Sequence, residues 1–177
     1  MNDKQLIRSC LQGDVEEYRK IVNKYNGRIM AIAINILGNR EDAEDACQEA
    51  FIKAYCHLDK YDSKKSFNNW LYGIIYNQCL DKLRKRRRFY KFLNKMKRES
   101  FQFTNGRAST NSIHHPFPKR VLKNLSLKER AILFLWAVEG YTSEEIGSVL
   151  KCSASTARVH LFKARKKIKA ILEKENV

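Results

Sequence analysis

Apolar residues recur along this chain at the three- and four-residue spacing of amphipathic helices, and no alternation of strands and helices interrupts them. The 177 residues include only two prolines and seven glycines, so few positions break a helix. The 44% apolar content is enough to bury the core of one ordinary domain or of two small ones. The pattern therefore predicts an all-α protein.

The first half of the pattern predicts consecutive helices. Gly13 separates a short first helix from a longer one, which ends before Gly38, a suitable C-terminal stop. Asn39 is a good N-cap for a third helix, which we expect to run to about His57. Residues 59–65 are polar and have no apolar period, so they predict a connection.

A change of composition divides the chain. Ser66 caps a fourth helix that continues past Leu83 and becomes strongly basic. Between about Glu99 and His115 the chain is rich in Ser, Thr, Asn, Gln and Gly, with little that forms a packed face. We therefore predict two small helical domains, residues 1–98 and 118–177, joined by a flexible linker, residues 99–117.

The second domain has the spacing of a helix-turn-helix motif. Its helices begin at two S/T-x-x-E capping boxes, Ser126 with Glu129 and Thr142 with Glu145. The first box opens a helix expected over 127–139, and the second opens a short helix over 143–150. A tight connection and a longer helix from Ala154 follow. Apolar spacing predicts the buried stripe of this last helix: Ala157, Leu161, Ala164, Ile168 and Leu172.

The chain is strongly basic, with 35 Lys and Arg against 19 Asp and Glu, a net charge of +16 and a pI near 9.8. Such a charge predicts a polyanionic partner. The sequence has neither an apolar run of the roughly 18 residues that span a membrane nor a signal-peptide core at Met1–Lys4. We therefore expect a cytoplasmic protein, without membrane insertion, that binds nucleic acid.

Metal and catalytic motifs are missing from the sequence. The five cysteines are scattered, with no C-x-x-C pair and no matching histidine spacing, which predicts reduced thiols and no metal site. There is no H-E-x-x-H, Walker loop, Gly-rich fingerprint or metal-spaced carboxylate set. We expect no cofactor and no enzyme activity.

The fourth predicted helix combines rings, amides and cations. Asn69, Trp70 and Asn77 can receive unstacked bases, although Trp70 is more simply explained as core. Ten Lys or Arg residues lie between Lys82 and Arg98, beside aromatic side chains. This composition permits phosphate binding and base stacking.

The third predicted helix is acidic within this basic protein, with Glu41, Asp42, Glu44, Asp45 and Glu49. DNA repels such a surface. Gln48 and Phe51 lie beside it, and charge complementarity with an aromatic anchor favours a protein partner. The preference of helix starts for acids explains only the first two of these residues.

In this order, the segments resemble the extracytoplasmic-function (ECF) sigma factors, the minimal class of bacterial sigma factor. The resemblance is carried by residues 39–51, by residues 67–72 with Asn77 and Asp81, and by residues 141–165. It covers nearly the whole chain, and the combination is specific where each segment alone is not. It implies a factor that binds core RNA polymerase and directs promoter-specific transcription initiation.

The resemblance also implies roles for individual residues. Docking on the clamp helices of the largest polymerase subunit falls to Asp45, Gln48, Glu49 and Phe51. The resemblance assigns binding of the melted minus-ten element, with one base flipped into a pocket, to Tyr61, Lys64, Ser66, Asn69 and Asn77. It assigns binding of the nearby DNA backbone to Lys82, Arg84 and Arg87. The duplex minus-thirty-five element falls to Ser155, Thr156, Arg158, Val159, Phe162, Lys163, Arg165 and Lys166. The flap of the second-largest polymerase subunit and an anti-sigma factor are further implied partners.

The chain departs from the family pattern at several positions. Gly73 stands where Arg is common, Lys151 where the turn often has Gly, and Val159 and His160 where Ser and Arg are common. The promoter sequence therefore does not transfer. A different class of function, a stand-alone helix-turn-helix regulator that binds a symmetric operator as a dimer, is the alternative. The acidic third helix favours the sigma-factor interpretation.

Overall fold

The computed structural model describes residues 3–96 and 117–173, and within these ranges every regular element is a helix. The N-terminal domain contains α1 (Asp3–Leu11), α2 (Val15–Leu37), α3 (Arg40–Cys56), the short 3-10 helix η1 (Leu58–Lys60) and α4 (Phe67–Met96). The C-terminal domain contains α5 (Lys119–Lys123), α6 (Leu127–Ala137), α7 (Ser143–Leu150) and α8 (Ala154–Glu173). The predicted all-α class is confirmed. The predicted linker, apart from Phe117, lies outside the described residues.

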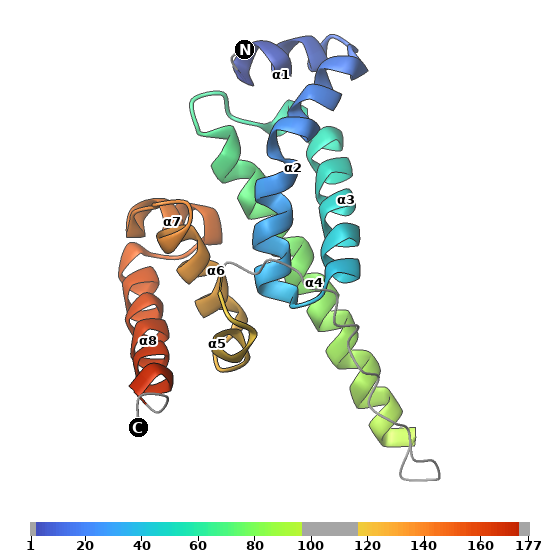
Figure 1. Ribbon diagram of the computed structural model, residues 1–177. Coiled ribbons are helices and arrows are strands. Elements are labelled where there is room, and N and C mark those ends of the chain that lie inside the picture. Colours follow the sequence, from blue (N-terminus) through green and yellow to red (C-terminus); the bar gives the residue numbers. More distant parts are fainter. Residues whose placement is uncertain (1–2, 97–116, 174–177) are drawn as a thin grey trace.

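The N-terminal domain is a bundle of α2, α3 and α4, with α1 packed on α2. Its core is made of apolar positions at helical spacing, such as Ile21, Ile29 and Ile32 on α2 and Leu71 and Ile75 on α4, all of which are fully buried. The C-terminal half of α4 extends past the other helices of this domain (Figure 1). The long basic end of α4 is therefore presented away from the bundle.

The caps confirm the predicted helix boundaries of this domain. The Asp14 side chain accepts a hydrogen bond of 3.0 Å from the backbone N–H of Glu16, which starts α2. Gly38 ends α2 with a φ of 81°, a conformation that glycine adopts without strain. The Asn39 side chain accepts a 2.8 Å bond from the backbone N–H of Asp42 and starts α3. Local sequence thus determines where these helices begin and end.

The C-terminal domain has the predicted helix-turn-helix. Both predicted capping boxes are formed, and the helix opened by the first one ends at Ala137, two residues before its expected end. Lys151 occupies the left-handed turn position with a φ of 51°. The glycine that the motif requires is Gly147, where a Cβ atom would lie 2.6 Å from the carbonyl oxygen of Cys152. The close approach of the turn to α7 therefore requires glycine at position 147, inside the helix, while Lys151 occupies the turn position where the family often has glycine.

The predicted buried stripe of α8 is partly confirmed. Ala157 and Ala164 are buried, and Leu161 and Ile168 pack partly buried against the core. Leu172 is 46% exposed, so its assignment to the stripe was wrong. The last turn of α8 extends beyond α5 and α6, which form the rest of this core (Figure 1).

The two domains pack against each other. Helix α6 lies against α2, and α7 lies against α4. Buried side chains from both domains join one continuous apolar cluster, to which the C-terminal domain contributes Phe134, Leu135, Ile146 and Val149 among others. This packing decides which surfaces of the two domains stay accessible.

Candidate nucleic-acid and protein interfaces

One face of α3 carries exposed side chains at helical spacing. Asp45, Gln48, Glu49 and Ile52 follow one another at intervals of three, one and three residues, and all four are exposed. We call this set the α3 stripe. It brings together three of the four residues predicted to bind polymerase.

The fourth predicted residue, Phe51, does not lie on the α3 stripe. Its side chain is only 7% exposed and packs in the core, and its carbonyl oxygen accepts a hydrogen bond from the Tyr18 hydroxyl. The neighbouring Ile52 is 64% exposed instead. An apolar anchor on this face is therefore Ile52, which helical spacing from Asp45 identifies and residue type alone does not.

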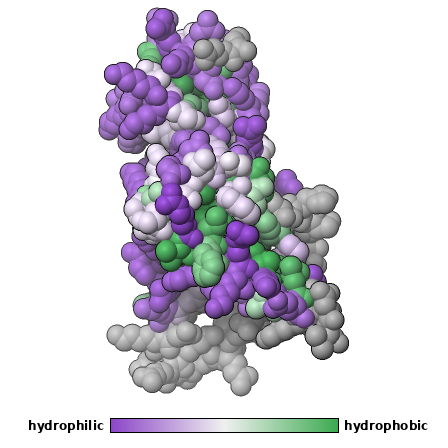
Figure 2. All heavy atoms as spheres, turned by 90° about the vertical axis from the view of Figure 1, so that its left-hand side faces the viewer, coloured by the Kyte–Doolittle hydropathy of each residue, from purple (hydrophilic) through white to green (hydrophobic). Residues whose placement is uncertain are grey.

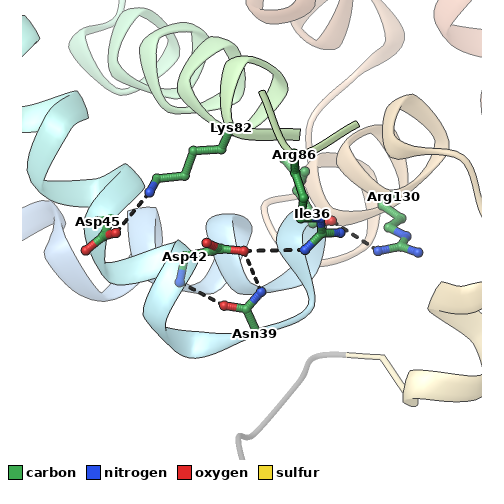
Figure 3. Close-up of polar contacts among 7 residues, drawn as sticks. All are labelled: Ile36, Asn39, Asp42, Asp45, Lys82, Arg86 and Arg130. Atoms are coloured by element: carbon green, nitrogen blue, oxygen red, sulfur yellow. Dashed lines mark hydrogen bonds and ion pairs between the residues drawn. The ribbon is translucent and has the colours of Figure 1, made fainter. Parts of the chain in front are cut away.

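Ion pairs join the acids of α3 to the cations of α4 (Figure 3). The Lys82 ammonium lies 3.0 Å from the Asp45 carboxylate, and the Arg86 guanidinium lies 3.4 Å from that of Asp42. The Lys82 side chain is only 18% exposed. A residue predicted to bind DNA and a residue predicted to bind polymerase are thus partners in one ion pair.

A groove of about 600 Å³ lies between the two domains. From the N-terminal domain it is lined by Lys60, Tyr61, Asp62, Lys65, Ser66, Asn69, Trp70, Gly73, Ile74 and Asn77. From α7 and the following turn it is lined by Glu144, Glu145, Ser148, Val149 and Lys151. We call it the interdomain groove. It gathers four of the predicted minus-ten residues, whereas the fifth, Lys64, is exposed outside its lining.

Two aromatic rings that line this groove pack against each other and against a third ring. The ring centroids of Tyr61 and Trp70 are 5.4 Å apart, and Phe67 lies 5.3 Å from the first and 5.5 Å from the second. Burial, followed by the nearby Asp3 and Asp62 carboxylates, raises the pKa of the Tyr61 hydroxyl. A second pocket of about 220 Å³ shares Trp70 and Asn77. Half-buried rings and an exposed amide therefore lie side by side, as base stacking and base-edge hydrogen bonding require.

The predicted backbone-binding residues lie further along α4. Arg84 and Arg87 line a shallow basic depression with Arg88 and Lys91, although Arg84 also pairs with Asp81 at 3.2 Å. At about 1.5 Å per residue, this depression is roughly 15 Å from Asn77 along the helix axis. The structure does not bring these cations into the interdomain groove.

The predicted DNA-facing side of α8 is open to solvent. Seven of the eight predicted residues are exposed and share one half of the helix surface: Ser155, Arg158, Val159, Phe162, Lys163, Arg165 and Lys166. We call this the α8 face. The eighth, Thr156, is half-buried, and its hydroxyl hydrogen-bonds to that of Ser153.

The α8 face is both apolar and basic. Val159 is 50% exposed and Phe162 is 69% exposed, and Figure 2, which faces the side of the molecule with α7 and α8, shows apolar patches among hydrophilic residues there. The Arg165 guanidinium lies 5.3 Å from the ring centroid of Trp136. Arg158 pairs with Glu144, and both side chains are about three-fifths exposed. Such an exposed pair is weak and easily replaced.

Another ion pair fixes α8 to α6. The Glu129 side chain is 4% exposed, and its two oxygens accept hydrogen bonds of 2.8 and 3.0 Å from the Lys167 ammonium. Burial alone would raise the pKa of Glu129, but hydrogen bonds from Lys167 and Ser126 outweigh it and lower this pKa. Lys167 is therefore structural, unlike its neighbours on the α8 face.

Comparison with known proteins gives the family. Residues 21–89 match the family described as Sigma-70 region 2, and residues 119–168 match Sigma-70, region 4. The RNA polymerase sigma factor NccH of Alcaligenes xylosoxydans xylosoxydans is 32% identical, over 99% of this chain and 97% of that protein. The ECF RNA polymerase sigma factor SigW of Bacillus subtilis (strain 168) is 27% identical, over 94% of each chain. The chain belongs to the ECF sigma factors.

This sigma factor is a DNA-binding transcription initiation factor that directs promoter-specific initiation. Two solved structures have a similar fold. CnrH in complex with the cytosolic domain of CnrY gives a TM-score of 0.71 at 22% identity, over 97% of each chain. The sigma factor RpoE in complex with the anti-sigma factor NepR from Bartonella quintana gives 0.72 at 21% identity, over 89% of this chain and 98% of that one.

The described part of this sigma factor lacks the marks of a membrane protein and of a metalloprotein. Residues 3–96 and 117–173 contain no helix long and apolar enough to cross a membrane. The same residues contain no cluster of three or more metal-ligating side chains. Burial raises the pKa of the Cys10 thiol, and it raises that of Cys47 to about 12, so these buried thiols are protonated at neutral pH.

Sequence reasoning missed several residues of the candidate sites. Ile52 on the α3 stripe and Lys60 and Lys65 in the interdomain groove were not singled out. Helical spacing identifies the isoleucine. The two lysines lie in a polar connection whose path no periodicity predicts, and the contribution of α7 to the groove follows only from the packing of the domains.

Proposed function

We propose that the two domains of this sigma factor divide promoter recognition between them. Residues 1–98 dock on core RNA polymerase and open the minus-ten element, residues 118–177 read the duplex minus-thirty-five element, and residues 99–117 join them. The observation that carries the proposal is that three chemically different surfaces lie on separate elements: the α3 stripe, the interdomain groove and the α8 face.

The α3 stripe is proposed to bind the clamp helices of the largest polymerase subunit. Asp45 and Glu49 supply charge that steers docking, Gln48 supplies a hydrogen-bonding amide, and Ile52 supplies an exposed apolar anchor. Phe51 supports this surface from the core rather than contacting the partner.

The N-terminal wall of the interdomain groove is proposed to hold the melted minus-ten strand. Asn69 and Asn77 offer donors and acceptors to a base edge, and Tyr61 with Trp70 offers ring faces. Extracting a base costs a few kcal/mol of unstacking, which stacking and hydrogen bonds in such a pocket offset. Ser66 is part of this wall and Lys64 is exposed outside the lining of the groove. Lys82, Arg84 and Arg87 are proposed to hold the phosphates of the adjoining DNA.

The α8 face is proposed to enter the major groove of the minus-thirty-five duplex. The residues proposed to face base edges are Ser155, Arg158, Val159, Phe162 and Lys163, and those proposed to lie nearer the phosphates are Thr156, Arg165 and Lys166. The family match does not favour the alternative of a stand-alone helix-turn-helix regulator.

Further partners and the compartment follow from the family. We infer that the flap of the second-largest polymerase subunit also binds this protein, as membership of the ECF sigma factors implies. We further infer that an anti-sigma factor binds it, because the two similar solved structures are complexes with the anti-sigma factor NepR and with the cytosolic domain of CnrY. We also infer that it acts in the cytoplasm, where polymerase is, and that it is not an enzyme.

Run-off transcription with purified core polymerase tests this function. We expect initiation from a subset of promoters, which Asp45→Arg with Glu49→Arg abolishes because reversed charge repels the clamp. The matched control is Glu16→Arg with Glu173→Arg, which makes the same change of charge on exposed residues away from the α3 stripe. Transcription that stays at the background of core enzyme alone would refute the proposal.

A further inference from the structure

A series of aromatic rings leads from the core of the N-terminal domain to the proposed minus-ten surface. Tyr25 on α2 is buried, and its ring centroid lies 5.4 Å from that of Phe67, the first residue of α4. Phe67 is buried too, and its ring packs against those of Tyr61 and Trp70, which line the interdomain groove. Tyr25 therefore supports, through one intervening ring, both rings that are proposed to stack on bases.

The hydroxyl end of the Tyr25 side chain is fixed by α1. It donates a 2.7 Å hydrogen bond to the Asp3 carboxylate, whose other oxygen accepts a 2.6 Å hydrogen bond from the Lys24 ammonium. Burial alone would raise the pKa of Asp3, but hydrogen bonds from Lys24 and Tyr25 outweigh it and lower this pKa. Burial, followed by the hydrogen bond to Asp3, raises the pKa of Tyr25. At neutral pH an ionised acceptor therefore meets a protonated donor, a combination that makes a strong hydrogen bond.

Helix α1 also packs against the segment that carries Tyr61. It contacts η1, and the backbone N–H of Tyr61 closes η1 by donating to the Leu58 carbonyl oxygen at 3.2 Å. Leu58 is buried in the same apolar cluster as Leu6 and Ile7 of α1. Figure 1 shows α1 across the end of the bundle at which the connection from η1 to α4 lies. The segment that carries Tyr61 therefore lies against α1, as does the hydroxyl of Tyr25.

The placement of Tyr61 and Trp70 matters because both rings are only half-buried. Trp70 lines both the interdomain groove and the smaller pocket of about 220 Å³, so open space adjoins much of its surface. A ring that is already fixed when a base arrives loses less conformational freedom on stacking than a ring that is free to move. The contacts behind these rings therefore contribute to the affinity for an unstacked base.

We propose that Tyr25 is a positioning residue for the minus-ten surface and that Asp3 fixes its ring. The Tyr25 ring holds Phe67 in place, and Phe67 in turn holds Tyr61 and Trp70 in the arrangement that accepts unstacked bases. This inference rests on the proposed function of the interdomain groove. The residues that line the groove and the smaller pocket do not include Asp3, Tyr25 or Phe67. These three residues therefore act through the rings and not by touching DNA.

Single-strand binding by the polymerase holoenzyme tests the inference, with core polymerase at saturating concentration. The probe is a pool of single-stranded DNA oligonucleotides that the unmodified holoenzyme selects from randomised sequences and that core polymerase alone rejects. Tyr25→Leu removes the ring, whereas Tyr25→Phe keeps the ring and loses the hydrogen bond to Asp3.

The matched controls are Tyr18→Leu and Tyr18→Phe. Tyr18 is also a buried tyrosine of α2 whose hydroxyl donates a hydrogen bond, in this case to the carbonyl oxygen of Phe51. Its ring packs against Tyr55 at the end of α3, with centroids 4.8 Å apart. The controls therefore loosen the same helix by the same chemical change, without touching the rings of the minus-ten surface.

We expect Tyr25→Leu to lower the affinity for this pool about tenfold, because the supporting ring contact is lost. Tyr25→Phe should lower it about threefold. Adding Asp3→Ala to Tyr25→Phe should have no further effect, because both changes break the same hydrogen bond. Neither Tyr18 variant should change the affinity. If circular dichroism shows that Tyr25→Leu loses helix content, the comparison of Tyr25→Phe with Tyr18→Phe decides.

The fluorescence of Trp70 in the free protein gives a readout that does not depend on DNA. The sequence has two tryptophans, so Trp136→Phe leaves Trp70 as the only one. In this background, Tyr25→Leu should shift the emission to longer wavelength, because water reaches a ring that is held less firmly. Tyr18→Leu should leave the emission unchanged.

The outcomes separate the two proposals. Equal losses of single-strand affinity in Tyr25→Leu and Tyr18→Leu would overturn the inference, because any loosening of the domain would then weaken binding. An unchanged Trp70 emission in Tyr25→Leu, or a shifted emission with unchanged affinity, would also overturn it. Asn69→Ala with Asn77→Ala tests the groove itself. If this double variant bound the pool as tightly as the unmodified protein, the minus-ten assignment would fail, and the inference with it.

Discussion

The minus-ten and minus-thirty-five surfaces proposed for this sigma factor differ in how the rest of the chain treats them. The minus-ten surface lies in a groove whose opposite wall is α7, with Glu144 and Glu145 facing it. The α8 face has no such wall, and its largest apolar side chain, Phe162, is 69% exposed. One surface is enclosed between the domains, and the other is free on a single domain.

This difference follows from the chemistry of the two tasks. Reading intact duplex needs a convex helix that enters a groove of the DNA, and such a helix works without help from the other domain. Holding a melted base needs a concave pocket, which a neighbouring element can fill. Access to the concave surface therefore depends on how the two domains pack, whereas access to the convex α8 face does not.

The largest expected effect is the loss of open-complex formation when the minus-ten surface is changed and the minus-thirty-five surface is left intact. Asn69→Ala with Asn77→Ala should reduce open-complex formation by polymerase holoenzyme on the order of a hundredfold, because the flipped base loses its hydrogen-bonding partners. Permanganate reactivity of unpaired thymines measures this. The control, Asn23→Ala with Asn26→Ala, changes two exposed amides on α2. Binding to minus-thirty-five duplex should stay unchanged, and an equal loss there would contradict the division of tasks.

The reverse experiment uses Arg158→Ala. If Arg158 contacts a base edge, the variant should bind the preferred duplex less tightly by about 1 to 3 kcal/mol, and it should no longer distinguish the four base pairs at the contacted position. Duplexes selected from a randomised pool by the unmodified protein, and single-base variants of them, measure this loss. Arg19→Ala is the control, because Arg19 is an arginine on α2 that is similarly exposed and similarly paired with a carboxylate, and it lies outside the C-terminal domain. A loss that is the same on every sequence would indicate a phosphate contact instead.

A smaller effect concerns the stability of the C-terminal domain. Glu129→Gln should lower its free energy of unfolding by about 1 to 2 kcal/mol at pH 7, because it removes a buried charge-assisted contact with Lys167. The Trp136 fluorescence during urea unfolding measures this in a Trp70→Phe background. Glu173→Gln, which breaks an exposed pair with Lys169, should cost less than about 0.5 kcal/mol.

The same variant has a predicted pH dependence. The folded state lowers the pKa of Glu129 below its ordinary value of 4.5. A lowered carboxyl pKa stabilises the fold above that ordinary value, and the stabilisation is lost as the pH falls through the folded pKa. The difference between Glu129→Gln and the unmodified protein should therefore shrink on acidification below about pH 4.5. A difference that is constant from pH 7 to pH 3 would show that the ion pair is not its cause.

Much of the fold was predictable because it depends on local rules. Gly38, Asn39 and the boxes at Ser126 and Thr142 end or begin helices at the expected residues, since caps act within one turn. Lys151 stands where the turn often has Gly, and the structure places this residue in the left-handed region that glycine favours. The departure at Gly73 had no local explanation, and the approach of α7 now provides one.

By itself, the sequence determined the helices, the acidic and basic surfaces and the family, because helical spacing, caps and charge are properties of neighbouring residues. Only the tertiary structure decided that the Phe51 carbonyl oxygen accepts a hydrogen bond from the Tyr18 hydroxyl, that Lys82 pairs with Asp45, and that α7 forms one wall of the interdomain groove. These features join residues far apart in the chain. Their geometry depends on how helices pack, which no single stretch of sequence encodes.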